Sequence, residues 1–233
     1  MENVKVAAVT GASRGLGAVF ARVLSEEGYA VALGARDLGA IQRLAASLPG
    51  PALAHPLDVG DSGSVWAFRD AVLSRFGRLD ALVNNAGIGI FKRLEEFSPT
   101  EIEQTFRVNI QGVWSATTVF LPQLKAARGL VFMVSSDVST RTFPTGGPYT
   151  ASKFALRALA RTLQQENPEL RVMELRPGAT DTSFAGSTPG APGKEWFLRP
   201  ETVAETVRFA LRLPPEARLE EIVIRSSSQT PEY

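Results

Sequence analysis

A tyrosine and a lysine four residues apart are the side chains in this sequence best suited to chemistry. Tyr149 and Lys153 lie in the run Pro-Tyr-Thr-Ala-Ser-Lys-Phe-Ala, and positions i and i+4 of a helix share one face. A nearby ammonium favours phenolate over phenol, so it is expected to lower the pKa of the tyrosine from its usual value of about 10. Such a tyrosine can donate and accept a proton in turn. A chance pairing on a helix face is the alternative.

Strand-like and helical segments alternate on both sides of this pair. Short apolar runs rich in valine and leucine predict buried strands, and the stretches between them predict helices. A capping box and a proline at 98–101 mark the start of a long helix. The predicted strands are 4–10, 29–34, 52–57, 79–84, 130–135, 171–175 and 221–225, and the predicted helices run from the first glycine loop to 27 and over 38–48, 64–76, 98–127, 149–167 and 201–213.

This alternation predicts an α/β fold of the Rossmann type, with a doubly wound parallel seven-stranded sheet and helices on both faces. The 233 residues are enough for one such domain, and no linker separates a second one. Residues 1–233 are therefore predicted to form a single dinucleotide-binding domain. In such sheets, ligands bind beyond the carboxyl ends of the strands, where the strand order reverses.

Three glycines follow the first predicted strand. Gly11, Gly15 and Gly17 would leave room for backbone N–H groups to approach a pyrophosphate at a helix amino terminus. Their spacing is G-x-x-x-G-x-G, and it lacks the Gly-Lys-Ser/Thr ending of a nucleoside-triphosphate loop. An ordinary glycine-rich turn is the alternative, but a position between a strand and a helix favours a dinucleotide.

The end of the second strand indicates which dinucleotide is bound. An NAD site places an acid there for the ribose 2′-hydroxyl, whereas an arginine accommodates a 2′-phosphate. Ala35 offers no acid and Arg36 offers a guanidinium, while Arg14 in the glycine loop supplies a second positive charge. Asp37 is expected to begin the next helix. We therefore predict NADP(H) as the cofactor. Asp58, which ends the third strand, is either an adenine contact or a helix cap.

Taken together, these motifs resemble the short-chain dehydrogenase/reductase family, in its single-domain branch with a Tyr-x-x-x-Lys pair. The resemblance extends to about Thr182 and rests on motifs that are each weak alone. These are Thr10-Gly11-x-x-x-Gly15-x-Gly17, Asn84-Asn85-Ala86-Gly87, Asn109, Ser136, Tyr149-x-x-x-Lys153 and Pro177-Gly178.

The resemblance implies a role for each matching residue. Tyr149 would donate the proton in reduction and accept it in oxidation, and Lys153 would bind the nicotinamide ribose. Ser136 would hydrogen-bond the substrate oxygen. Asn109 would distort the long helix and hold a water in a relay to the lysine, and Thr182 would contact the nicotinamide carboxamide. All predicted cofactor contacts are Thr10, Gly11, Ser13, Arg14, Gly15, Leu16, Gly17, Arg36, Asp58, Val59, Asn85, Ala86, Gly87, Tyr149, Lys153, Pro177, Gly178, Thr180 and Thr182.

The implied activity is an NADP(H)-dependent interconversion of a carbonyl and a secondary alcohol. A non-catalytic dinucleotide-binding regulator or redox sensor on the same fold is the alternative. The full set of Asn109, Ser136, Tyr149 and Lys153 favours the enzyme, because a sensor has no need of all four.

The substrate side is less determined by the sequence. Residues 183–200, rich in glycine and proline, predict a mobile lid. Many family members carry a small glycine-containing turn after this serine. This chain carries Asp137-Val138-Ser139-Thr140 there, so the loop after Ser136 is predicted to have a different shape. The sequence ends soon after its last strand, so no long tail is expected to close the site. His55 is expected at a strand end without a catalytic role. Phe184, Trp196 and Phe197, with Phe143 and 88–91 opposite, form either a partly apolar substrate pocket or an anchor for the lid.

The composition of the chain excludes several classes of partner and site. The formal net charge is +1, with acids and bases interspersed, which argues against a nucleic-acid partner. There is no cysteine, so disulfides, thiolate metal sites and cysteine nucleophiles are excluded, and no metal is predicted. The absence of a signal peptide or a long apolar run predicts a cytoplasmic protein. In relatives, the helices beginning near 99 and 149 pair across subunits, so the resemblance implies a homodimer or homotetramer.

Overall fold

Seven parallel strands form one sheet in the computed structural model, which describes residues 4–229. The strand order is β3-β2-β1-β4-β5-β6-β7, so the order reverses between β1 and β4. The predicted Rossmann-type α/β fold is therefore confirmed. The strands are β1 (Val6–Thr10), β2 (Ala30–Ala35), β3 (Ala52–Pro56), β4 (Ala81–Asn84), β5 (Leu130–Val134), β6 (Arg171–Pro177) and β7 (Glu221–Ile224).

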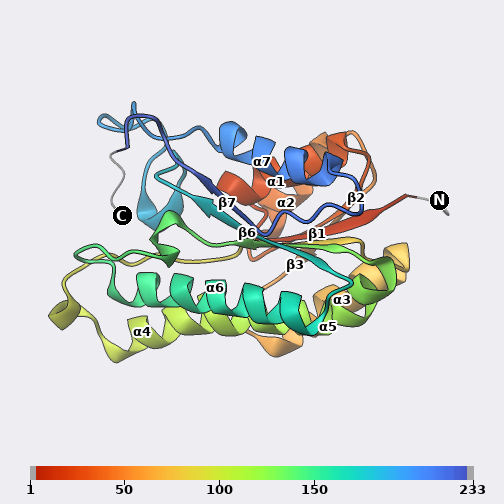
Figure 1. Cartoon of the computed structure of the whole chain (residues 1–233), viewed down its shortest axis with the longest axis horizontal. Helices are drawn as coiled ribbons and strands as arrows, with labels where there is room; N and C mark the ends of the chain where they lie inside the picture. The colour runs from red at the N-terminus through yellow and green to blue at the C-terminus, as the bar shows by residue number, and fades with distance from the viewer. Residues whose placement is uncertain (1–3, 230–233) are drawn as a thin grey trace.

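Helices cover both faces of the sheet (Figure 1). One layer holds α1 (Gly15–Glu26), α2 (Leu38–Ser47) and α7 (Pro200–Arg212), and the other holds α3 (Ser62–Phe76), α4 (Pro99–Phe106), α5 (Gly112–Ala127) and α6 (Gly147–Glu166). The loops after β4, β5 and β6 gather at the carboxyl ends of the strands, on the left of Figure 1. These loops therefore surround the carboxyl ends of the strands, where ligand binding was predicted from the sequence.

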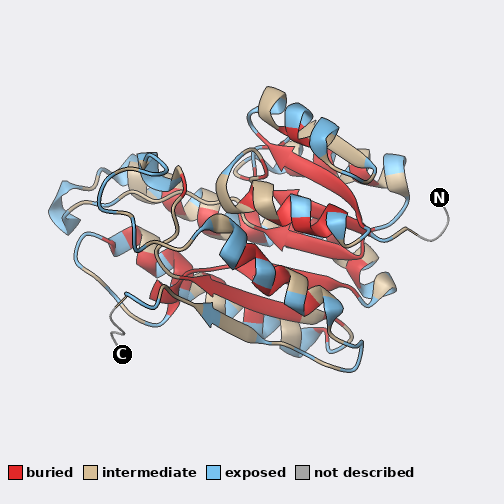
Figure 2. Ribbon diagram, turned by 90° about the horizontal axis from the view of Figure 1, so that it is seen from above, coloured by how far each residue is buried: buried red, intermediate tan, exposed pale blue. Residues whose placement is uncertain are grey.

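The strands are buried because both faces of the sheet are covered. Alternate residues of a strand point to opposite faces. In β1, Ala7 and Val9 pack into the core beneath α1 and α7, whereas Val6 and Ala8 pack into the core beneath α3, α5 and α6. Figure 2 shows the strands as a buried layer between more exposed helices and loops. This two-sided burial explains why the strands read as continuous apolar runs.

The predicted helix boundaries hold at two caps and fail at a third position. The Asp37 side chain caps α2 by accepting a hydrogen bond from the Ala40 amide at 2.9 Å, as predicted. Ser98 and Glu101 form the predicted capping box of α4. The cap of α3 is Asp61 and not Asp58, so one of the two interpretations of Asp58 was wrong. Asp58 instead accepts a hydrogen bond from the Gly60 amide within the segment 57–61, which connects β3 to α3.

The long helix predicted over 98–127 is not continuous. A π-helical turn, Arg107–Gln111, separates α4 from α5, and Asn109 lies at its centre. A π-turn adds a residue to one helical turn and often marks a functional site. The distortion implied by the resemblance is therefore present at Asn109.

The segment 183–200, for which we predicted a lid, is tied to the end of β6. The amide of Leu198 donates to the Ala179 oxygen at 2.9 Å, and the amide of Asp181 donates to the Leu198 oxygen at 2.8 Å. The Asp181 carboxylate also accepts from the Gly190 amide at 2.8 Å and pairs with Lys194 at 3.2 Å. The base of the segment is thus fixed, while its middle is largely exposed.

Two expectations concern the ends of the chain and the membrane. Met1 to Asn3, where no signal peptide was expected, and the last four residues lie outside the described residues. Among residues 4–229, no helix has the length and apolar character needed to cross a bilayer.

The close packing of α5 on the loop after β3 gives a stability prediction. A Cβ on Gly112 would lie 2.8 Å from the Val59 side chain and 2.9 Å from its main-chain oxygen. Gly112→Ala is therefore expected to lower the free energy of unfolding by about 1–3 kcal/mol. Gly39→Ala, in α2, is the matched control, because its Cβ would meet only side-chain atoms at 3.4 Å or more. That change should raise stability by about 0.4–1 kcal/mol. Urea unfolding followed by circular dichroism measures both, and equal effects would contradict the packing argument.

Candidate active site

The glycine loop connects β1 to α1 and packs against the loop after β4. Gly11 has φ +66° and Gly15 has φ +56°, a region that favours glycine. A Cβ on Gly11 would lie 2.8 Å from Ala86 Cα, and one on Gly17 would overlap the Gly11 oxygen. The glycines thus allow the chain to turn and to approach its neighbours closely.

Hydrogen bonds hold the ends of β1 and β4 together at the point where the strand order reverses. The Thr10 hydroxyl accepts from the amides of Asn85 and Ala86, both at 3.0 Å. The Asn85 side-chain amide donates to the main-chain oxygens of Thr10 at 3.0 Å and Gly11 at 3.1 Å. These predicted cofactor contacts therefore also stabilise the loop. The next residue, Gly87, brings the chain close to the Nζ of Lys153.

The amino terminus of α1 is the part of this loop that fits a phosphate group. Arg14 is the cap residue, and no side chain caps the helix. The first N–H groups of such a helix have no intrahelical partners and attract anions. Ser13 lies in the loop just before the helix, and Leu16 lies in its first turn. The residues present thus fit the pyrophosphate of a dinucleotide.

Two exposed arginines flank the site. Arg36 directly follows β2, and neither Arg36 nor Arg14 forms a hydrogen bond or ion pair within residues 4–229. Both guanidinium groups are therefore available to an anionic ligand. Asp58 accepts from the Gly60 amide at 2.9 Å and is exposed, whereas Val59 is buried against α5.

The end of β6 closes the site on the side of the nicotinamide contacts predicted from the sequence. Thr182 is buried and its side chain lies 3.4 Å from the Cβ position of Gly15. The Thr180 hydroxyl donates to the Gly178 oxygen at 2.9 Å, next to Pro177 at the strand end. The structure therefore brings this segment against the glycine loop, although the two are far apart in the sequence.

The four predicted catalytic residues come from three parts of the fold: the π-turn, the loop after β5 and α6. Tyr149 and Lys153 share a face of α6, with the lysine Nζ 5.6 Å from the centroid of the tyrosine ring. Ser136 is the second residue after β5, and its hydroxyl accepts from the Val138 amide at 3.3 Å. The Lys153 Nζ donates to the Val134 oxygen at 3.0 Å, which anchors α6 to β5.

Asn109 connects the π-turn to two other parts of the site. Its side-chain oxygen accepts from the Ile88 amide at 2.8 Å, and its Nδ2 donates to the Ile88 oxygen at 2.9 Å and to the Ser152 hydroxyl at 3.0 Å. The side chain is buried and its hydrogen bonds are made within the protein. It thus positions the loop after β4 against α6, while its role in a proton relay stays a prediction.

Burial sets the protonation of the tyrosine and the lysine in the protein alone. Burial raises the pKa of Tyr149 to about 12; the Ser136 side chain lowers it and the charge of Asp137 raises it further. Burial also lowers the pKa of Lys153 to about 8, against the opposing effect of Glu174. The expected lowering of the Tyr149 pKa by Lys153 is therefore absent in this state. The reason is that removal from water penalises both charged forms more than their proximity favours them.

An aromatic cluster surrounds the tyrosine. The ring of Phe91 meets Tyr149 edge-on at 5.3 Å, and the Phe184 ring lies 5.6 Å from it. Phe143 packs on Phe91 at 5.7 Å. Trp196 and Phe197 contact each other edge-to-face instead, with ring centroids 4.6 Å apart. The predicted apolar surface is therefore split: one part faces Tyr149 and the other lies within the lid segment.

The polar and charged residues behind Ser136 were not predicted from the sequence. The buried carboxylate of Asp137 accepts hydrogen bonds from Arg225 and Gln229, which lie about 90 positions later in the chain. The only signal was the departure from the family pattern at 137–140. His55, by contrast, lies at the end of β3 against Phe68, as expected.

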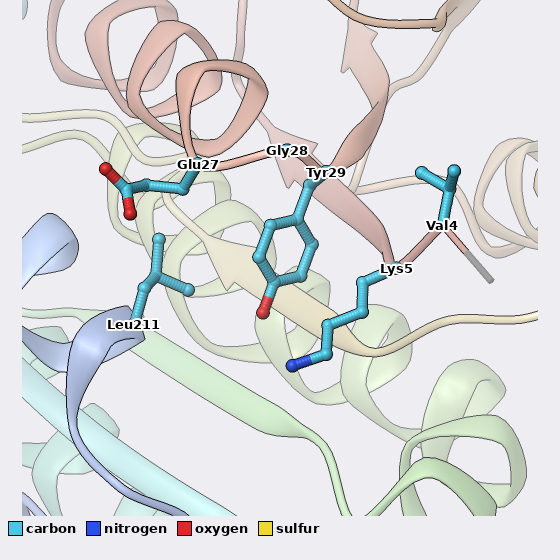
Figure 3. Close-up of a pocket in the computed structure, with 6 residues that line it drawn as sticks. All are labelled: Val4, Lys5, Glu27, Gly28, Tyr29 and Leu211. Atoms are coloured by element: carbon cyan, nitrogen blue, oxygen red, sulfur yellow. The ribbon is translucent and has the colours of Figure 1, made fainter.

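A separate hollow lies at the opposite edge of the sheet (Figure 3). It has a volume of about 350 Å³, and the side chains of Lys5, Tyr29 and Leu211 extend towards it. Lys5 and Tyr29 lie at the amino ends of β1 and β2, far from the predicted cofactor contacts. This hollow is therefore not part of the candidate active site.

The chain matches known proteins along most of its length. The family model described as short chain dehydrogenase matches residues 5–191. Among solved structures, an alcohol dehydrogenase from the archaeon Thermococcus sibiricus, complexed with 5-hydroxy-NADP, is 48% identical to this chain. The superposition covers 99% of this chain and 100% of that chain, with a TM-score of 0.96.

Two further relatives differ in what their names report. A 3-ketoacyl-(acyl-carrier-protein) reductase from Brucella melitensis, complexed with NADH, is 28% identical, with a TM-score of 0.88 over 96% of this chain and 97% of that chain. Glycine betaine reductase ATRR from Emericella nidulans is 36% identical over 94% of this chain, but the chain spans only 18% of that longer protein.

The buried lysine gives a prediction for the pH dependence of stability. The pKa of Lys153 is about 8 in the folded protein, whereas its ordinary value is 10.5. Between pH 8 and pH 10.5, the lysine therefore holds its proton in the unfolded chain but has lost it in the folded protein. The stability of the wild type relative to Lys153→Met should therefore rise with pH across that window, by up to about 3 kcal/mol. Urea unfolding of both proteins between pH 7 and pH 10 measures the difference.

The matched control is Tyr149→Phe. The raised pKa of Tyr149 affects stability only above its ordinary value of 10, where the unfolded chain loses the proton first and stability falls. Its difference from the wild type should therefore stay flat in the tested range. A flat difference for Lys153→Met would mean that the ammonium is not desolvated.

Proposed function

The chain belongs to the short-chain dehydrogenase family, and from this premise we propose that it is an NADP(H)-dependent oxidoreductase that interconverts a carbonyl and a secondary alcohol. The observation that carries the proposal is the convergence of Ser136, Tyr149 and Lys153 beside the glycine loop and the π-turn at Asn109. A non-catalytic regulator on the same fold has no observation in its favour.

Bound nicotinamide would supply the hydride, and the protein has to orient the substrate and handle one proton. Reduction of a carbonyl builds negative charge on its oxygen, and hydrogen-bond donors must already point at that position. The hydroxyls of Ser136 and Tyr149 are the two donors that meet there. Because burial keeps Tyr149 protonated, it is ready to donate its proton in the direction of reduction.

Oxidation needs the same tyrosine as a base, so its pKa has to fall when the site is filled. A lysine ammonium is a compact charge suited to this task. Lys153 is held against β5 within reach of the tyrosine ring, and its own pKa of about 8 leaves much of it charged near neutrality. We assign to Lys153 the stabilisation of the phenolate and the binding of the nicotinamide ribose.

The preference for NADP(H) over NAD(H) rests on Arg36 and Arg14. No acid occupies the end of β2, and both guanidinium groups are exposed and have no partner within residues 4–229. Both guanidinium groups would donate charge-assisted hydrogen bonds to a 2′-phosphate. The 48% identical alcohol dehydrogenase was solved with an NADP derivative, which agrees with this assignment.

The substrate is expected to be a small ketone, aldehyde or secondary alcohol with an apolar part. Phe91 and Phe184 lie next to Tyr149, yet 44% and 37% of their surfaces are exposed. Exposed aromatic rings beside a reacting group suit an apolar ligand that covers them. The segment 183–200, which carries Phe184, would act as the lid over this ligand.

A homodimer or homotetramer is part of the proposal. A groove of about 490 Å³ is lined by Ile110 of the π-turn, Trp114 of α5 and Leu159 of α6. Trp114 is exposed in this groove, and Phe154 of α6 is also exposed. An apolar helix face of this kind suits a second copy of the chain. A cytoplasmic location and the absence of a nucleic-acid partner complete the proposal.

The first functional prediction concerns the cofactor. The wild type should bind NADPH more tightly than NADH, and Arg36→Asp should reduce this preference by about tenfold or more, because a charge-assisted hydrogen bond of about 1.5–3 kcal/mol is lost. Fluorescence titration with each dinucleotide measures the ratio. Arg75→Asp, at the far end of α3, is the control for the charge change. An unchanged ratio in Arg36→Asp would assign the 2′-phosphate to another residue.

The second functional prediction concerns the proton donor. Tyr149→Phe should bind NADPH like the wild type but lose turnover by a factor of about 10² or more, as expected on removal of a general acid. Absorbance of NADPH with a panel of ketones, aldehydes and secondary alcohols measures the rate. Tyr29→Phe, at the opposite edge of the sheet, should keep full turnover. Retained activity in Tyr149→Phe would remove this residue from the mechanism.

A further inference from the structure

The residue after Ser136 is a buried aspartate held by a distant part of the chain. The Asp137 side chain is 6% exposed, and its Oδ2 accepts hydrogen bonds from Arg225 Nε at 3.3 Å and Gln229 Nε2 at 2.9 Å. Arg141 pairs with the same oxygen at 2.7 Å. The Ser136 hydroxyl contacts the other carboxylate oxygen at 3.3 Å. The position of Asp137 therefore affects the group proposed to bind the substrate oxygen.

Gln229 links this loop to a second segment of the site. Its Oε1 accepts a hydrogen bond from the Ala179 amide at 3.4 Å, while its Nε2 donates to Asp137. A Cβ on Gly178 would overlap the same Oε1, so a glycine is needed for the glutamine to lie there. One side chain after β7 thus joins the loop that follows β5 to the loop that follows β6.

The main chain of the Ser136 loop is held from β6. Arg176 donates to the main-chain oxygens of Ser136 at 3.5 Å and Asp137 at 3.3 Å, and it also bonds the Thr140 hydroxyl. Arg176 itself pairs with Glu221 on β7. The arginine therefore fixes the backbone, and Arg225 and Gln229 fix the carboxylate.

Two carboxylates act on the reacting pair, and charged groups from neighbouring elements pair with one of them. Asp137 faces Tyr149, and Glu174 on β6 faces Lys153. Glu174 accepts from the Ser139 hydroxyl at 2.8 Å and pairs with Arg157 of α6 at 2.8 Å. Arg157 also pairs with Glu221 at 2.7 Å, and Arg161 lies 3.8 Å from Glu221. Of the two carboxylates that face the pair, Asp137 is the one held by residues beyond β7.

We propose that Arg225 and Gln229 are positioning residues: they hold the Asp137 carboxylate, and through it they fix the Ser136 hydroxyl and the negative charge that faces Tyr149. The proposal rests on the proposed function, because it takes Ser136 and Tyr149 as the donors to the substrate oxygen. It assigns a functional role to residues beyond the part of the chain that carries the family motifs.

The pH dependence of alcohol oxidation tests the proposal. The rate should rise as Tyr149 loses its proton. Asp137→Asn removes a facing negative charge, so the rising limb should move to lower pH by about half a unit or more. Gln229→Leu removes a donor without changing any charge, so the less compensated carboxylate should move the limb to higher pH. Arg225→Met should also move it to higher pH, and Arg225→Lys should restore it.

A double variant separates positioning from a general loss of structure. In the Asp137→Asn background, Gln229→Leu should cause no further shift, because its effect acts through the carboxylate. Arg218→Met is the control: this exposed arginine donates a hydrogen bond to the Pro168 oxygen, which precedes β6 at the other edge of the sheet, and its profile should match the wild type. Thermal unfolding of each variant checks folding. If Asp137→Asn does not fold, the shifts of Gln229→Leu and Arg225→Met decide the matter.

Hydrogen exchange without cofactor gives a second readout that does not depend on turnover. Gln229→Leu should speed exchange of the amides in 136–140 and 177–180, and Arg218→Met should not. The proposal is overturned if the pH limb stays in place in Asp137→Asn, Arg225→Met and Gln229→Leu, or if the double variant is additive, even when turnover falls. If the wild type reduces no carbonyl, the proposed function is overturned instead. In that case, unchanged amide hydrogen exchange in Gln229→Leu would show that the link between the two loops is also absent.

Discussion

The close junction between the ends of β1 and β4 is the constraint on which the rest of the site depends. Thr10 and Asn85 bond each other's backbone there, and glycines at 11 and 17 allow the two loops to touch. This junction lies where the strand order reverses, so helices leave it on opposite faces and a crevice opens between them. The uncapped start of α1, the loop after β4 and Thr182 all reach their places because this junction holds.

Burial has opposite consequences for stability and for readiness to react. A phenol and an ammonium taken out of water both favour their neutral forms, and neither supplies much charge to the other in the protein alone. Under the proposed function, the buried tyrosine is therefore ready to donate a proton, and its use as a base requires its pKa to fall when the site is filled. Residues kept for reaction in this way cost folding free energy, which the two packed cores on either side of the sheet offset.

Local patterns predicted most of the fold, since strands, caps and glycine turns depend on neighbouring residues. Asp37 and the capping box at Ser98 are examples, and the segment with Tyr149 and Lys153 is helical as expected. The prediction for the Tyr149 pKa failed because two residues on a helix face reveal proximity but not burial. The contacts of Asp137 could not be foreseen either. They join residues 88 and 92 positions apart, and no periodicity or motif records such a pairing.

The late position of Arg225 and Gln229 in the chain also has a consequence for biosynthesis. A chain grows from its amino terminus and folds as it emerges. All the predicted cofactor contacts and the four predicted catalytic residues lie before residue 183. A nascent chain that has paired β1 to β6 therefore holds these residues, while the carboxylate beside Ser136 still lacks two of its partners. The Asp137 carboxylate therefore gains these two partners only after residues 225 and 229 have been synthesised, later than strands β1 to β6.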